Sequence, residues 1–303
     1  MICIDLGSNS LRMIQIDCQT KEFVKRYEKI VKTAELLHNE GVISPAALER
    51  ILKGFKEASE IFDFKHEPCI ALTTEAMRQA SNATDVIKSI YQETGLKFKI
   101  ISPQKEAELT LVGVERRLES LGFRGTFLLV DIGGGSTEII FKKGHLSESK
   151  SFPVGIVTMA SKYPSKELLQ ENLPKELSAI KAYAHAYYLR EGKPDFYVAT
   201  AGTPTTIAAF KQKMSYEDYD TARINGSTLN YFDCMQALQQ LLALSVDERT
   251  GYVGVGREEL IVVGVMIYAS LFDIFDYEAS VIIDDGLREG AAIWACEKGL
   301  KSS

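Results

Sequence analysis

Two glycine-containing turns of similar wording constrain the fold of this chain more than any other feature. The first is DLGSNSLR at residues 5–12 and the second is DIGGGSTE at residues 131–138, each directly after a short apolar segment. A glycine turn after a strand lets backbone N–H groups approach a phosphate, and the strand-end aspartate can hold a cation that neutralises phosphate charge. The repetition predicts two similar lobes that hold one phosphorylated ligand from both sides.

Length and composition exclude several classes of protein. The 303 residues are 46% hydrophobic and 25% charged, enough for a large core and for two domains. A net charge of −6 argues against a general nucleic-acid binder, so no DNA partner is expected. The most apolar segment, residues 260–275, is too short to cross a bilayer and contains Asp273. It predicts a buried helix, and no membrane association is expected.

The cysteines form no recognisable redox or metal pattern. There are five of them, and no two are spaced as Cys-x-x-Cys. A disulfide framework, a zinc site and an iron–sulfur site are therefore not expected. The first residues already resemble a strand rather than a secretion signal, so we expect a reducing, cytoplasmic environment.

The order of apolar segments indicates a mixed α/β protein. Strands are predicted at 2–4, 11–16, 25–31, 69–72, 98–101, 127–130, 138–141, before 152, at 196–199 and at 280–283. Helices are predicted from Pro45, with Ser44 as the N-cap, and at 83–94, 105–118, 175–190, 260–275 and 287–298. Because the pattern restarts after Gly122, we place the first domain at 1–121 plus 286–303 and the second at 122–285.

The repeated strand–DxG–strand unit, with a third glycine turn TAGTPTT at 200–206, resembles the actin, Hsp70 and sugar-kinase superfamily. That resemblance implies two ribonuclease-H-like (actin-like ATPase) domains with the active-site cleft between them. Six segments are similar, in order, to the exopolyphosphatase and guanosine-pentaphosphate phosphohydrolase family. They are DLGSNSLRM, TTEAMRQASN, ISPQKEAELTLVGV, DIGGGSTE, FPVG and DDGLREG. The chain resembles the short two-domain members, which lack the C-terminal HD-type domain of longer relatives.

The family resemblance implies a hydrolase for phosphoric anhydrides. Its substrate would be inorganic polyphosphate, the 5′ γ-phosphate of guanosine pentaphosphate, which leaves guanosine tetraphosphate, or both, with Mg²⁺ or another divalent cation as cofactor. Two alternatives stay open: a non-catalytic alarmone sensor and an ATP-dependent small-molecule kinase of the same superfold. The oligomeric state also stays open, with a homodimer among the arrangements.

The second glycine turn carries the main predicted metal and phosphate site. Asp131 and Glu138 flank the turn, where their carboxylates could bind a hard cation that bridges phosphate oxygens. The phosphate itself would be held by Gly133, Gly134, Gly135 and Ser136. The plain alternative is a tight β-turn followed by an ordinary solvated glutamate. Three consecutive glycines give more backbone freedom than a hairpin needs, which favours the functional interpretation.

The first turn offers an equivalent set. Asp5 would contact the metal, and Ser8 and Asn9 would bind phosphate. Serine and asparagine are also ordinary turn formers, so this prediction competes with a purely structural one.

Glu106 is the predicted general base. In the family, the last glutamate before the alanine of the "ISG-x-EEA" block activates the attacking water. The matching segment of this chain is ISPQKEA, and Glu106 stands at that position. Taken alone, it is only an acid in the first turn of a helix, where the macrodipole favours it. Pro103 and Lys105 differ from the usual family block, so the family's substrate preference transfers less readily than its reaction.

Several cations and one further turn complete the predicted site. Arg78 lies in the block whose arginine lines the family's phosphate cleft, and its guanidinium fork suits bidentate phosphate binding, although a surface cation is the alternative. Arg12 and Arg257 are further phosphate-binding candidates on the same argument. Gly202 and Thr203 resemble the turn that ATP-using members place under the adenosine, which the family keeps without ATP hydrolysis.

Overall fold

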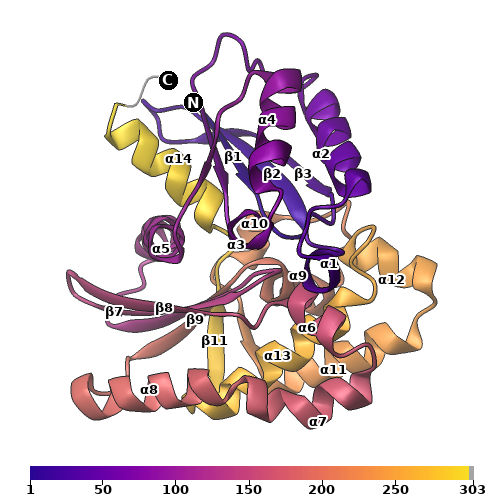
Figure 1. The fold of residues 1–303 in the computed structure, drawn as a ribbon. Helices are drawn as coiled ribbons and strands as arrows, with labels where there is room; N and C mark the ends of the chain where they lie inside the picture. The colour runs from indigo at the N-terminus through magenta and orange to yellow at the C-terminus, as the bar shows by residue number, and fades with distance from the viewer. Residues whose placement is uncertain (300–303) are drawn as a thin grey trace. The chain divides into compact units, whose positions relative to one another are not determined.

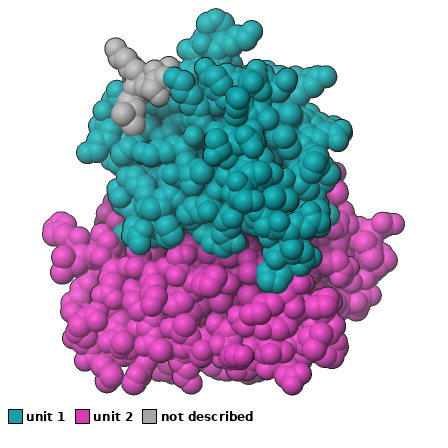
Figure 2. All heavy atoms as spheres, viewed as in Figure 1, with its two compact units in different colours: residues 1–113, 286–303 teal, residues 114–285 magenta. Residues whose placement is uncertain are grey.

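The computed structural model describes residues 1–299, which form two compact units. Unit 1 consists of Met1–Gly113 together with the segment from Gly286 onward, and unit 2 is Val114–Asp285 (Figure 2). The division falls inside helix α5 (Pro103–Ser120), whereas the sequence pattern places it just after that helix, near Gly122.

Unit 1 is built on a five-stranded sheet in the order β3-β2-β1-β4-β5. The strands are β1 (Ile2–Leu6), β2 (Ser10–Ile16), β3 (Phe23–Ile30), β4 (Cys69–Thr73) and β5 (Phe98–Ile100). The first three are antiparallel neighbours, while β1, β4 and β5 run parallel. Strand β1 is fully buried at the centre of the sheet, as the apolar residues on both sides of Asp5 predict.

Unit 2 repeats this arrangement with one added strand. Its sheet has the order β10-β11-β9-β6-β7-β8. The strands are β6 (Phe127–Ile132), β7 (Thr137–Lys143), β8 (Leu146–Phe152), β9 (Phe196–Thr200), β10 (Thr228–Asn230) and β11 (Ala279–Ile282). Again three antiparallel strands are followed by two parallel ones, and β10 extends the edge antiparallel to β11. The duplicated α/β fold expected from the two turns is confirmed.

The helices of unit 1 pack around its sheet. They are α1 (Leu37–Glu40), α2 (Pro45–Ala58), α3 (Glu75–Gln79), α4 (Ala83–Thr94), the first part of α5 and α14 (Leu287–Glu297). Helix α2 begins as predicted, because Ser44 Oγ accepts the Ala47 N–H at 3.0 Å and Pro45 occupies the first turn. The chain's last helix, α14, packs against β1, β2 and β4 (Figure 1).

The helices of unit 2 are α6 (Ile156–Lys162), α7 (Lys166–Glu176), α8 (Ser178–Glu191), α9 (Gly202–Lys211), α10 (Thr221–Ile224), α11 (Tyr231–Ala243), α12 (Val246–Val253) and α13 (Leu260–Phe275). The single helix predicted over 175–190 is wrong at its start. Leu177 ends α7 and precedes α8, so residues 175 and 176 belong to α7, which continues through Pro174. Helix α13 is the buried helix that the apolar segment predicts.

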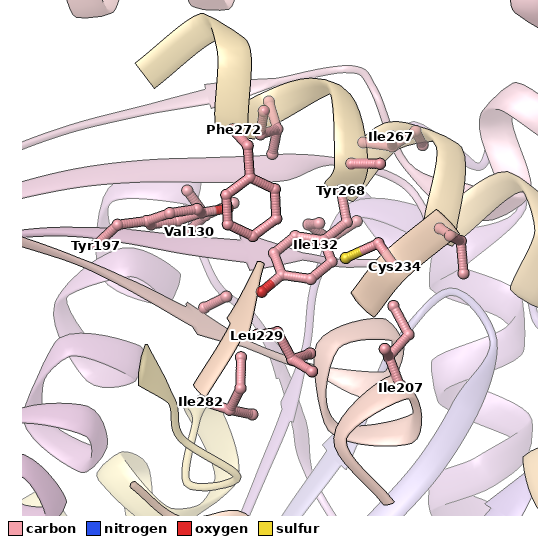
Figure 3. Close-up of a cluster of buried hydrophobic side chains, with 14 of the residues drawn as sticks. Val130, Ile132, Tyr197, Ile207, Leu229, Cys234, Ile267, Tyr268, Phe272 and Ile282 are labelled. Atoms are coloured by element: carbon pink, nitrogen blue, oxygen red, sulfur yellow. The ribbon is translucent and has the colours of Figure 1, made fainter. Parts of the chain in front are cut away.

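An aromatic cluster joins α13 to the sheet of unit 2 (Figure 3). Tyr197 of β9 and Tyr268 of α13 are fully buried, and both rings contact Phe272, with centroids 5.5 and 5.2 Å away. The Tyr268 hydroxyl is hydrogen-bonded to Ser280 on β11. The cluster fixes the central strands from which the site loops emerge. Within residues 1–299, no helix is both long and apolar enough to cross a membrane.

The structure contains a disulfide bond, although the cysteine spacing led us to expect no disulfide framework. Cys18, just after β2, is bonded to Cys296 near the end of α14, with Cα atoms 5.2 Å apart. The two residues are 278 positions apart, and only the packing of α14 on the first sheet brings them together. Sequence spacing gives no signal for such a pair. The remaining cysteines, Cys3, Cys69 and Cys234, are free.

Candidate active site

The glycine turn of unit 2 is held from behind by the start of helix α6. Gly133 N–H donates to Ser136 O at 2.9 Å and closes the turn between β6 and β7. The carbonyls of Gly133 and Gly134 accept the N–H groups of Ile156 and Val157 at 3.0 and 2.8 Å. The carbonyls of the turn are therefore bound by the protein itself. The amides of Gly134 and Gly135 donate to no backbone carbonyl in the described part of the chain, which suits them to an anion.

The close contact with α6 depends on a further glycine. A Cβ atom at Gly155 would lie 2.3 Å from Gly134 O, so a larger residue there would displace the turn. The FPVG segment thus belongs to the construction of the phosphate turn, a role that its sequence alone does not reveal.

The two acidic residues beside this turn differ in their surroundings. Asp131 and Glu138 are directly opposite in the β6–β7 register, so their side chains share one face of the sheet. Glu138 is 2% exposed, and its Oε1 accepts the hydroxyls of Ser136 and Ser151, both at 2.7 Å. Asp131 is partly exposed. The one hydroxyl hydrogen of Ser136, a residue predicted to bind phosphate, is therefore donated to Glu138 and orients that carboxylate.

A metal ion at this turn would need ligands from outside the protein. Within residues 1–299, no group of three or more His, Cys, Asp and Glu side chains has a metal-binding arrangement. Paired carboxylates still fit Mg²⁺, because this ion usually keeps several waters and binds through one or two carboxylates plus substrate phosphates.

The first turn, in unit 1, has the same backbone construction. Gly7 N–H donates to Ser10 O at 3.0 Å, and the Asn9 carbonyl accepts the N–H groups of Val31 and Lys32 at 2.9 Å each. The Ser8 carbonyl accepts from Ala34 at 2.9 Å. Here too the turn carbonyls are bound by the segment after the third strand. The duplication therefore extends from strand order to individual hydrogen bonds.

The acidic pair of the second turn has no equivalent in the first. Asp5, which is 8% exposed, faces Arg12 across β1 and β2, at the register that Glu138 occupies opposite Asp131. Arg12 Nε donates to Ser10 Oγ at 3.1 Å and lies 3.5 Å from Glu28 Oε1. The first turn thus combines an acid with a cation, whereas the second combines two acids.

Glu106 and Arg78 form a partly buried ion pair. Arg78 Nη1 donates to Glu106 Oε2 at 2.9 Å and to the Ile101 carbonyl at 2.7 Å, while Nε donates to Glu75 Oε2 at 2.8 Å. The side chains of Arg78 and Glu106 are 15% and 12% exposed. Burial disfavours the charged guanidinium, but the charge of Glu106 and the hydrogen bond to Glu75 outweigh it, so the pKa of Arg78 is raised.

The topology explains why these two residues meet. Arg78 lies on α3, which follows β4, and Glu106 lies in the first turn of α5, which follows β5. Strands β4 and β5 are parallel neighbours, so their carboxyl ends share one edge of the sheet. The family blocks predict separate roles for Arg78 and Glu106. Their pairing depends on β4 and β5 being neighbours, which no local motif signals.

Lys105, the residue before Glu106, is directed elsewhere. Its Nζ lies 4.2 Å from the centroid of the Trp294 ring on α14 and 2.7 Å from Glu108 Oε1. A cation held over an indole and beside a carboxylate has less freedom to approach a ligand. This lysine links α5 to α14.

The remaining predicted residues lie in unit 2. Gly202 begins α9, and Thr203 is buried against α13, where a Cβ on Gly264 would lie 2.1 Å from Thr203 Oγ1. The Thr203 side chain therefore serves helix packing. Arg257 lies in the loop after α12, its guanidinium carbon 6.0 Å from the centroid of the Tyr216 ring.

The DDGLREG block contributes polar contacts that fasten unit 2. Tyr219 donates to Asp284 Oδ1 at 2.9 Å, and the Asp284 N–H donates to Asn225 Oδ1 at 2.7 Å. Asp285, which is 2% exposed, is paired with Arg117 of α5, and its carbonyl accepts the Thr200 hydroxyl at 3.0 Å. These contacts hold the segment that directly follows strand β11.

Comparison with known proteins gives consistent matches. The Ppx/GppA phosphatase family model matches residues 13–296. A bifunctional 3-dehydroquinate synthase/phosphatase of Fusobacterium nucleatum is 27% identical over 97% of this chain, which spans 46% of that relative. Exopolyphosphatase 2 of Mycobacterium tuberculosis is 26% identical over 88% of each chain.

Solved structures match over nearly the full length. The Aquifex aeolicus member of the Ppx/GppA protein family is 28% identical, with a TM-score of 0.73 over 99% of this chain and 98% of that one. An exopolyphosphatase from Cytophaga hutchinsonii, 21% identical, shares the fold with a TM-score of 0.84 over 100% of this chain and 99% of that one.

Proposed function

Because the chain belongs to the Ppx/GppA phosphatase family, it is a phosphohydrolase, and we propose that it removes the terminal phosphoryl group of inorganic polyphosphate. Guanosine pentaphosphate, cleaved at its 5′ γ-phosphate, is the second proposed substrate. The observation that carries the proposal is the partly buried Glu106 paired with Arg78 at the carboxyl edge of the first sheet. A carboxylate held in this way suits a general base for water.

Glu106 would accept a proton from the attacking water at a carboxylate oxygen. The cation beside it favours the ionised form of the carboxylate, which a base requires. Arg78 Nη2 is buried and lies 2.6 Å from Glu75 Oε2. Arg78 is proposed both to orient Glu106 and to bind substrate.

The cation is proposed to be Mg²⁺, with Asp131 and Glu138 of the second turn as its protein ligands and Asp5 of the first turn as a separate candidate. When bound, it would neutralise charge on the phosphate oxygens. Glu138 is held in one orientation by Ser136 and Ser151, so its position does not depend on the metal. The amides of Gly134 and Gly135 would stabilise charge on the transferred group, whereas the Gly133 amide, also predicted to do so, donates to Ser136 O within the turn.

Further contacts to the polyanion are proposed from the same reasoning. They are assigned to Ser8, Asn9, Arg12, Ser136, Gly202, Thr203 and Arg257. The burial of Thr203 against α13 limits it to a contact through its backbone. A cytoplasmic location and a homodimer belong to the proposal as well.

The test is a phosphate-release assay with Mg²⁺ and three substrates, namely polyphosphate, guanosine pentaphosphate and ATP. We expect the wild type to release free phosphate from polyphosphate, guanosine pentaphosphate or both. The Glu106→Gln variant should not release it. A matched control is Glu57→Gln, which removes a carboxylate from the Lys29 ion pair elsewhere in unit 1. Binding of guanosine pentaphosphate without phosphate release would instead identify a sensor, and transfer from ATP to an acceptor would identify a kinase.

A further inference from the structure

Arg78 is held by two carboxylates rather than one. Its Nε donates to Glu75 Oε2 at 2.8 Å, and its Nη2 lies 2.6 Å from the same oxygen without the geometry of a hydrogen bond. On the other side, Nη1 donates to Glu106 Oε2. One planar guanidinium therefore bridges Glu75 and Glu106.

Glu75 is itself fixed on a short helix. It lies at the start of α3, three residues before Arg78, a spacing that places both side chains on one face of the helix. Its second oxygen, Oε1, accepts a hydrogen bond from Gln79 one turn later. With a side-chain exposure of 17%, Glu75 is shielded enough for these contacts to persist. The glutamate is thus held between two residues of its own helix.

An arginine needs such an anchor to serve as a fixed partner. Its side chain has several rotatable bonds, and the hydrogen bonds from Nη1 alone, to Glu106 and to the Ile101 carbonyl, leave the guanidinium free to pivot about that nitrogen. Contacts at Nε and Nη1 define both the plane and the rotation of the fork. A polyanionic substrate would compete for an arginine that was bound only to Glu106.

We propose that Glu75 is a positioning residue that keeps the Arg78 guanidinium on Glu106 while a phosphate substrate is present. The proposal rests on the proposed function, in which Glu106 is the general base. Glu75 contacts neither substrate nor water in this role. It acts through Arg78, by restraining the cation that orients the base.

The kinetic test compares Glu75→Gln with the wild-type enzyme and with the Glu57→Gln control, using polyphosphate and Mg²⁺. Glutamine keeps the size of the side chain but accepts a weaker hydrogen bond. We expect kcat to fall about tenfold, because a misplaced base slows the chemical step, while KM stays within about twofold. An unchanged kcat would overturn the proposal. A lower KM with unchanged kcat would show instead that Glu75 restrains an arginine whose only task is substrate binding.

A second measurement does not depend on activity. In ¹⁵N-labelled protein, the Arg78 Nε–H resonance can be identified by its absence from the Arg78→Lys spectrum. We expect its exchange with solvent to be about tenfold faster in Glu75→Gln than in the wild type, since a charge-assisted bond is lost. Equal exchange rates would contradict the anchoring role. If the wild type releases no phosphate from any substrate, the proposed function fails, and the exchange rates still decide whether Glu75 holds Arg78.

Discussion

Glu138 is buried and Glu106 partly buried, and the surroundings of the two carboxylates suit them to different chemistry. Glu106 faces the guanidinium of Arg78, which favours its ionised form and fixes its orientation. Glu138 accepts two serine hydroxyls and lies opposite Asp131, so two acidic groups face the same side of the second sheet. The protein itself supplies the cation beside Glu106, whereas the acidic pair Asp131 and Glu138 would take its cation from solution. The arrangement around Glu138 therefore favours a bound metal.

Asp131→Asn tests this assignment. A neutral amide attracts a hard divalent cation less than a carboxylate does, so the Mg²⁺ concentration for half-maximal phosphate release should rise about tenfold or more. The matched control is Asp273→Asn, which alters an exposed aspartate on α13 of the same unit. An Mg²⁺ titration that coincides with that of the wild type would remove Asp131 from the metal site.

Helices α5 and α14 meet at glycines in unit 1, and this contact holds the middle of α5 against the first turn of α14. A Cβ at Gly290 would lie 1.7 Å from Leu109 O, and a Cβ at Gly113 would lie 2.7 Å from Gly286 O. Only glycine allows the two backbones to approach so closely. The last glycine of the DDGLREG block is therefore required for packing, and α14 supports the helix that carries Glu106.

Gly290→Ala should destabilise the protein. The added methyl group meets main-chain atoms that cannot rotate away, so we expect the free energy of unfolding to fall by about 2–3 kcal/mol in urea denaturation. Gly251→Ala is the control, because a Cβ there meets nothing within 4 Å and the residue lies in helix α12. Equal stability of Gly290→Ala and the wild type would show that the helices can separate at little cost.

Elements with strong local signals were predictable from the sequence, and those set by tertiary contacts were not. Helix α2 follows from its serine cap and apolar periodicity, and α13 follows from its length and hydrophobicity. The short helix α3 has no side-chain cap, and the break at Leu177 lacks a glycine. The turns were recognisable as phosphate loops from their glycines. Their support by α6, the Arg78–Glu106 pair and the role of Glu75 depend on which strands are neighbours.

Unit 1 is completed by a chain segment from the far end of the sequence. Helix α14 packs on β1, β2 and β4, and the Cys18–Cys296 bond ties it to the turn after β2. The buried Glu289 also connects α14 to the sheet. Its Oε1 lies 2.6 Å from Arg288 Nε and 3.7 Å from Nη1 of Arg26 on β3. Burial opposes ionisation of Glu289, but these two cations outweigh it and lower its pKa. The fold therefore depends on long-range contacts between the two termini.

Loss of the disulfide should destabilise the molecule. The bond closes a loop with a sequence separation of 278, so its removal restores much conformational freedom to the unfolded chain. We expect Cys18→Ser, or the wild type in reducing agent, to lose about 2–4 kcal/mol of unfolding free energy. Reducing agent should have no effect on Cys18→Ser itself. A wild-type unfolding curve that is identical with and without reductant would show that the bond does not contribute in solution.

The most direct test of the proposed mechanism is turnover by Glu106→Gln at saturating polyphosphate and Mg²⁺. The substitution keeps the shape of the side chain and its contact with Arg78 but removes the group that accepts the proton. We predict a fall in kcat of at least about 10²-fold, the usual range for a lost general base, with the Kd for polyphosphate within about threefold of the wild-type value. Turnover equal to the wild type would contradict the assignment of Glu106 as the base.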